Sequence, residues 1–151
     1  MIQRIDHINL VADDLEAMIA FYRDLLGLRL GKRVTISGPW IEAVTRLPQV
    51  EAEVVFLEAP QGPGIELIQY HRPAGRRPAG LGDPNTKGLR HIAFRVAELN
   101  ALVAAMQAAG VEFASEIQQV PSAQVDFALQ HKRLIYCRDP EGNLLELCEF
   151  A

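Results

Sequence analysis

The hydrophobic and polar positions of this chain follow the same order twice. Residues 5–30 begin with an alternating stretch, typical of a strand, and continue with apolar side chains three or four positions apart, typical of a helix. Residues 89–113 repeat both patterns. Gly27 and Gly110 follow the helical stretches and supply the left-handed conformation at which many helices end. The pattern therefore predicts two copies of one strand–helix unit.

The two predicted helices differ in how they begin. Asp13, Asp14 and Glu16 form an arrangement like a capping box at the first start, where side chains satisfy free backbone N–H groups. Ala97 and Glu98 stand at the second start, and neither residue type is a preferred cap. We therefore expect the second helix to be capped more weakly by its own residues.

Two later apolar stretches also correspond to each other. "GIELIQY" at 64–70 matches "LLELCEF" at 144–150 when Glu66 is laid on Glu146. A further strand pattern precedes each of them, at residues 52–59 and 133–139. Each copy thus reads as a strand, a helix and three strands. Because such a unit cannot bury both faces of its sheet alone, we expect the two copies to share a core.

The predicted fold class is α+β, with one domain over residues 1–151. It consists of a module at 1–70, a linker at 71–88 and a module at 89–151. The linker is rich in Pro, Gly and Arg and lacks periodicity, which indicates a surface connection. A second interpretation is that its arginines cover or steer an anionic ligand. The pattern leaves open whether the modules pair within one chain or swap between chains.

Alternation along the strands predicts which side chains face away from the helices. Successive side chains of a strand point to opposite faces, so the apolar positions take the helix side. The polar residues left on the other face are His7, Asn9, Glu66, His91, Arg95 and Glu146. Each module therefore places one histidine and one glutamate on the face away from its helix.

A glutamate in the middle of an apolar strand needs a partner, because burying an unpaired carboxylate is costly. Taken singly, each of these residues has an ordinary explanation, such as a structural histidine or an edge glutamate facing water. Their repetition in both modules instead predicts convergent ligands for one divalent cation, namely His7, Glu66, His91 and Glu146. Imidazole and carboxylate ligands suit zinc, nickel, cobalt, manganese or iron alike.

Composition narrows the possible partners. The 151 residues are 49% hydrophobic with a formal net charge of −4, so there is no basic surface of the kind that follows nucleic-acid phosphates. No run of eighteen apolar residues and no basic-then-apolar leader is present, so we expect a cytoplasmic protein without a membrane partner. Cys137 and Cys148 lack zinc-site spacing and are expected to be buried, reduced thiols.

The stretches "DHINLVADDLEAMIAFYRDLLGLRL", "RHIAFRV" and "DPEGNLLEL" together resemble the vicinal oxygen chelate superfamily, the glyoxalase / bleomycin-resistance / extradiol-dioxygenase group. The closing turn and strand at 139–146 is the most specific of these motifs. The resemblance covers essentially the whole chain. It implies tandem βαβββ modules whose sheets curl into an open barrel around a metal cleft. It also implies that the family's ligand positions are His7, Glu66, His91 and Glu146.

The resemblance implies a metal-dependent lyase or isomerase of the glyoxalase or epimerase kind. In such enzymes the metal binds two oxygens of a small substrate and stabilises the charge that develops next to a carbonyl. Glu146 and Glu66 are the acids placed to move the proton. The resemblance also implies a homodimer with one divalent ion at each site. The substrate and the native metal are not specified.

Two long stretches without clear periodicity, 38–48 and 114–132, are expected to be lids over the cleft. Within them, Trp40 and Phe127 could wall an apolar pocket, and Glu42 and His131 could serve as further acid–base groups. An equally ordinary interpretation is that Trp40 packs the lid and Glu42 faces solvent. The candidate substrate-binding residues are Asn9, Trp40, Arg95 and Phe127.

Two other functions remain open. An extradiol dioxygenase uses two histidines and one carboxylate and keeps further positions open, so a fourth ligand at Glu66 disfavours it. Such enzymes commonly have further acid–base histidines, for which His71 and His131 remain. A drug-binding resistance module shares the fold but does no chemistry. In a metal-free protein of that kind, Arg95 would pair with Glu66 or Glu146.

Overall fold

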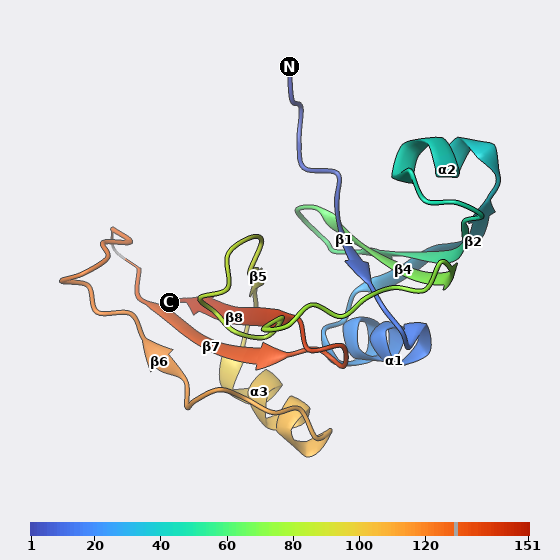
Figure 1. Ribbon diagram of the computed structural model, residues 1–151. Helices are drawn as coiled ribbons and strands as arrows, with labels where there is room; N and C mark the ends of the chain where they lie inside the picture. Colours follow the sequence, from blue (N-terminus) through green and yellow to red (C-terminus); the bar gives the residue numbers. More distant parts are fainter. Residues whose placement is uncertain (129) are drawn as a thin grey trace. The chain divides into compact units, whose positions relative to one another are not determined.

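The computed structural model describes residues 1–128 and 130–151. The chain forms two compact units, Met1–Arg77 and Pro78–Ala151 (Figure 1). Each unit contains one four-stranded mixed sheet, which confirms the α+β class and the duplicated plan. None of the helices in the described part of the chain has the length and apolar character needed to cross a bilayer.

The first unit combines a mixed sheet with three helical elements, of which the first two are continuous along the chain. Its elements are β1 (His7–Val11), α1 (Leu15–Ala20), η1 (Phe21–Leu25), β2 (Arg29–Ser37), α2 (Pro39–Thr45), β3 (Glu51–Glu58) and β4 (Gly64–Arg72). The strand order is β1-β4-β3-β2. β1 runs parallel to β4, and the other neighbours are antiparallel.

The second unit repeats this topology. Its elements are β5 (His91–Arg95), α3 (Leu99–Ala108), β6 (Gln118–Gln119), β7 (Lys132–Arg138) and β8 (Leu144–Phe150). The strand order is β5-β8-β7-β6, again with one parallel pair, β5 with β8. The register is also repeated, because Asn9 lies opposite Glu66 in the first sheet and Ala93 lies opposite Glu146 in the second.

The first predicted helix has the cap and most of the buried side chains that its sequence pattern indicates. The Asp14 side chain accepts a hydrogen bond from the backbone N–H of Ala17, which confirms the predicted cap. Leu15, Met18 and Ile19 are buried. After one and a half turns the α-helix continues as the π-helical segment η1, whose wider turn precedes the stop near Gly27 at φ +74°.

The start of α3 is capped from a distant strand. Glu98 has left-handed backbone angles and makes no side-chain cap, as expected from its residue type. The backbone N–H of Leu99 instead donates to Glu149 Oε1 at 3.0 Å, and Arg133 pairs with the other oxygen of the same carboxylate. The last strand of the module thus supplies the cap that the helix lacks.

We expect Glu149→Gln to lower the melting temperature by several degrees at neutral pH. The bond with Arg133 is the main reason that the pKa of Glu149 lies below its usual value of 4.5, and the Leu99 N–H acts in the same direction. A group whose pKa is lower in the folded state stabilises the fold at pH values above its unfolded-state pKa. This stabilisation is lost as the pH falls through the folded-state pKa. Thermal unfolding should therefore show the difference between the two proteins shrinking as the pH falls below 4.5. Glu112→Gln, on an exposed loop residue, should leave the melting temperature unchanged at every pH.

The segment 38–48 is not irregular, as its sequence suggested, because most of it forms α2. Pro39 stands in the first turn of this helix, where a missing N–H costs nothing. Ile41 is buried and packs in a small core with Val50 and Ala52, and Tyr70 packs against it. By strand alternation, Ala52 and Tyr70 share the face of Glu66, so one end of that face carries a helix.

The predicted linker is also more structured than its composition suggested. β4 extends through its first two residues, and Arg72 pairs there with Glu51 across the sheet. Farther along, Arg90 Nη1 donates to the backbone oxygens of Gly80, Leu81 and Asp83. The second half of the segment is therefore folded around one guanidinium and does not form a plain connection.

Both cysteines are buried free thiols, as expected. Burial raises the pKa of Cys137 to about 12, with the Asp139 charge acting in the same direction. Since the thiolate is the reactive form, we expect iodoacetamide at about pH 8 to leave Cys137 unmodified in the folded protein. Mass spectrometry should show both thiols alkylated only after denaturation. Rapid labelling of Cys137 under native conditions would contradict this.

Candidate functional site

The first sheet brings a histidine and a glutamate together on one face. His7 on β1 and Glu66 on β4 approach to 3.6 Å between Nε2 and Oε1. Asn9 also lies on β1 and donates from Nδ2 to the same Glu66 oxygen at 2.8 Å. The other oxygen of Glu66 accepts no hydrogen bond from the described residues. The predicted proximity of Asn9, His7 and Glu66 is thus confirmed within this unit.

Asp6 fixes the orientation of the His7 ring. His7 Nδ1 lies 3.0 Å from Asp6 Oδ2, and this bond is the main reason that the pKa of the Asp6 carboxyl lies below its usual value. An ionised carboxylate only accepts hydrogen bonds, so Nδ1 carries the proton. In the neutral ring, Nε2 then presents a lone pair to the lone pairs of Glu66. A proton on Nε2 or a metal cation between the two groups would remove the repulsion between these acceptors.

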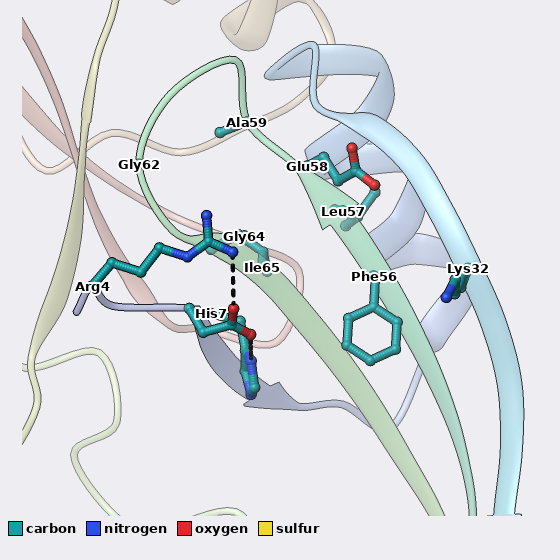
Figure 2. A pocket seen from close by; sticks show the side chains of 11 residues that line it. Arg4, His7, Lys32, Phe56, Leu57, Glu58, Ala59, Gly62, Gly64 and Ile65 are labelled. Carbon is teal, nitrogen blue, oxygen red and sulfur yellow. Dashed lines mark hydrogen bonds and ion pairs between the residues drawn. The ribbon is translucent and has the colours of Figure 1, made fainter. Parts of the chain in front are cut away.

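A cavity of about 520 Å³ opens beside His7 within the first unit. Figure 2 shows Arg4 and His7 on one side of it, with Phe56, Glu58 and Lys32 on the other. The His7 and Phe56 rings meet edge to face with their centroids 6.4 Å apart. The cavity therefore gives a small molecule room next to the imidazole.

The second sheet repeats the histidine–glutamate pair. His91 Nε2 on β5 lies 3.6 Å from Glu146 Oε2 on β8. Glu146 is more buried than Glu66, with side-chain exposures of 6% and 16%. The Tyr136 ring lies opposite Glu146 on β7, 5.4 Å from the His91 ring, and burial raises the pKa of its hydroxyl. Tyr136 therefore occupies the position that Phe56 has in the first sheet.

Lys132, which the sequence analysis missed, neutralises Glu146. Its Nζ lies 2.5 Å from Glu146 Oε1, and the ammonium-bearing side chain is only 17% exposed. Arg95, considered in the sequence analysis as a partner for Glu66 or Glu146, forms no ion pair with either. Its guanidinium lies 4.7 Å from the centroid of the Phe150 ring. The strand register could have indicated Lys132, since it lies opposite Phe150 on the face of Glu146.

The other predicted site residues occupy varied positions. Phe127 stacks edge to face on Phe150 with centroids 5.4 Å apart. Trp40 lies on α2 and is 58% exposed, while its neighbour Ile41 makes the buried contact. Glu42, also on α2, is half-buried, and His71, the last residue but one of β4, is exposed. His131 is paired through its backbone with Ala151. In the predicted lid at 114–132, Leu129 lies outside the described residues.

The turn "DPEGN" is built around the buried carboxylate of Asp139. Asp139 Oδ1 accepts the backbone N–H groups of Glu141 and Asn143, and Oδ2 accepts the Asn143 side-chain amide. Gly142 adopts φ +87°, which favours glycine. This turn sets where β8 begins and therefore which face receives Glu146.

No group of three or more His, Cys, Asp or Glu side chains able to hold a metal ion occurs among residues 1–128 and 130–151. Each unit supplies one histidine–glutamate pair on its own sheet. The four-ligand centre predicted from the sequence therefore stays a prediction.

Comparisons with known proteins agree with this architecture. The chain is 29% identical over 150 residues to the uncharacterized protein YaeR of Escherichia coli, covering 98% of this chain and 97% of that protein. A glyoxalase family protein from Bacillus cereus superposes with a TM-score of 0.87 at 26% identity, covering 99% of this chain and 95% of that one. The trypanothione-dependent glyoxalase I of Leishmania major shares the fold, with a TM-score of 0.65 at 21% identity and coverages of 97% and 86%.

The sequence profile of one family matches almost the whole chain, from residue 4 to residue 147. The chain belongs to the Glyoxalase/Bleomycin resistance protein/Dioxygenase superfamily.

Proposed function

We propose that this protein is a divalent-metal-dependent lyase or isomerase that transfers a proton next to the carbonyl of a small substrate. The observation that carries the proposal is the repeated pair of an imidazole nitrogen and a carboxylate oxygen, 3.6 Å apart in each sheet. Membership of a superfamily that includes glyoxalases supports it. The fold shared with a glyoxalase I supports it further.

The residues present fit a divalent ion. An ion about 2.1 Å from each ligand atom spans up to about 4.2 Å, so both members of a pair can reach one ion. The Asp6–His7 bond is the outer-shell contact that typically orients a metal-binding imidazole. Lys132 engages Oε1 of Glu146 and leaves Oε2 directed towards His91. The proposed ligands are His7, Glu66, His91 and Glu146, whether the two modules that share an ion belong to one chain or to two.

A divalent ion bound there would polarise the substrate carbonyl and stabilise negative charge on its oxygen. Glu66 is the better placed carboxylate for the proton, because its Oε2 accepts no hydrogen bond from the described residues while Asn9 holds Oε1. Glu146 is held at Oε1 by Lys132. We assign proton removal to Glu66 Oε2, which leaves Glu66 protonated. Glu146 would deliver a proton to the product after taking one from the Lys132 ammonium that it contacts, and exchange with solvent would reset both groups.

One observation favours a second candidate, a binding module without chemistry. The Lys132–Glu146 pair already satisfies the more buried carboxylate without a metal. In that case the protein would bind a small ligand equally well before and after chelation.

The test combines metal analysis with proton exchange. After incubation with zinc, nickel, cobalt, manganese or iron, we expect about one ion for each pair of modules. NMR in deuterated water should then show metal-dependent exchange at the carbon next to the carbonyl in hydroxyacetone or in the glutathione hemithioacetal of methylglyoxal. Light scattering on the same sample tests the homodimer that we also propose. A protein that binds none of these ions would leave the binding module as the function.

A further inference from the structure

Two cations and two aromatic rings gather on the face of the second sheet that carries His91 and Glu146. Arg95 on β5 and Lys132 on β7 approach the same Phe150 ring, at 4.7 Å and 5.8 Å from its centroid. Lys132 Nζ also lies 6.0 Å from the Phe127 centroid. Stacking on aromatic faces holds cationic groups in place while leaving their N–H donors available.

The positive charge in this cluster exceeds the negative charge that it meets. Lys132 pairs with Glu146, and because both side chains are largely buried, an unpaired charge on either would be costly. Arg95 forms no ion pair with any carboxylate of residues 1–128 and 130–151, and its other near neighbour across the strand is the neutral thiol Cys148. The guanidinium therefore keeps a fork of donors suited to a planar or tetrahedral oxyanion.

The first sheet carries different residues at the positions of these cations. In the first sheet the positions equivalent to Arg95, Lys132 and Phe150 hold Val11, Ala52 and Tyr70, as the repeated register shows. That module keeps its histidine–glutamate pair with apolar residues in their place. The two cations thus distinguish the second copy from the first, where α2 packs over Ala52 and Tyr70 at this end of the face.

We propose that Arg95 and Lys132 bind an anionic group of the substrate, a carboxylate or a phosphate, with Phe127 and Phe150 packing against its carbon atoms. Lys132 contacts Glu146, so the anion would lie within a few bonds of the reacting carbonyl, and the substrate would be a small organic acid or phosphate ester. This inference deepens the proposed function and relies on it for the reaction, whereas anion binding itself needs no metal.

The experiment measures binding of three probes by calorimetry, to the full-length protein after chelation and after zinc loading. Benzoate and phenyl phosphate carry the two anionic groups, and benzamide is the neutral analogue of benzoate. The variant is Arg95→Gln, which removes a charge that no carboxylate in the described part of the chain balances. Arg46→Gln, on an exposed arginine of the first unit, is the matched control. Zinc content and thermal unfolding are recorded for every sample.

We expect an anionic probe to bind at least tenfold more tightly than benzamide, and Arg95→Gln to remove about a factor of ten from anion binding alone. Whichever of benzoate and phenyl phosphate binds more tightly identifies the anion. Benzamide binding as tight as that of the better anion, no binding of either anion, or an equal loss in Arg46→Gln would overturn the proposal, even if zinc binds. Arg95-dependent anion binding by a protein that takes up no zinc would support this site and contradict the metalloenzyme.

Discussion

Glu146→Gln will reduce zinc affinity by more than 100-fold and remove metal-dependent proton exchange. Loss of outer-shell partners of metal ligands typically costs about 10–100-fold in affinity, and removal of a ligand should cost more. The amide has nearly the same shape as the carboxylate but lacks its charge, so the change tests coordination rather than packing. Calorimetric titration with zinc measures the affinity, and exchange in deuterated water measures the chemistry.

Two further variants separate metal binding from folding. Glu146→Gln leaves the largely buried Lys132 without its counter-charge, which destabilises the unit, whereas Glu146→Gln with Lys132→Met removes both charges and should restore stability. Both should bind zinc more than 100-fold more weakly than the parent protein. Glu149→Gln lies on the same strand but on the opposite face and should bind zinc normally. Unchanged zinc affinity in Glu146→Gln would exclude it as a ligand.

Asp139→Ala is expected to lower the free energy of unfolding by about 3 kcal/mol. Hydrogen bonds to a charged acceptor contribute about 1.5–3 kcal/mol each, but water can partly replace the lost carboxylate, so the total is smaller than the sum of the bonds. Asp139 is 4% exposed and organises the turn through backbone and side-chain amides of Glu141 and Asn143. Chemical denaturation should show a lower midpoint with little change in slope.

Asp139→Asn should cost less than the alanine change, because its amide oxygen can still accept both backbone N–H groups while its NH₂ replaces Oδ2 opposite the Asn143 amide. Asp126→Ala serves as the matched control, since this exposed aspartate also accepts a backbone N–H, from Ala128. Surface changes of this kind usually alter stability by less than about 0.5 kcal/mol. Equal midpoints for the Asp139 and Asp126 variants would mean that the turn is not held by its carboxylate.

The sequence predicted the parts of the site that depend on local alternation. His7 and Glu66 share a face because side chains alternate along each strand and the apolar neighbours of both residues take the helix side. The same holds for His91 and Glu146. Alternation does not say how an ammonium on one strand meets a carboxylate on the next, which depends on register. Lys132 was therefore missed, although its strand was largely predicted.

Elements whose stability comes from tertiary contacts were harder to predict. α2 has seven residues, too few to show a helical period. Its single buried residue, Ile41, is buried only because it packs against Val50 and Ala52, which lie outside the helix. The cap of α3 comes from Glu149, fifty residues away along the chain. Neither contact leaves a trace in a local window of sequence.

The duplicated register also restricts how this chain can change in length. Glu146 reaches its face because it stands two positions after Leu144, where β8 begins. Inserting one residue between them would turn the carboxylate towards α3 and bring its apolar neighbours to the ligand side. Two inserted residues would preserve the facing of every side chain while moving Glu146 by about 7 Å along the strand, away from His91. Insertions compatible with the site are therefore confined to the loops. Within β8, Glu146 faces the ligand pair and Glu149 faces the start of α3, so a residue inserted before both of them would displace both.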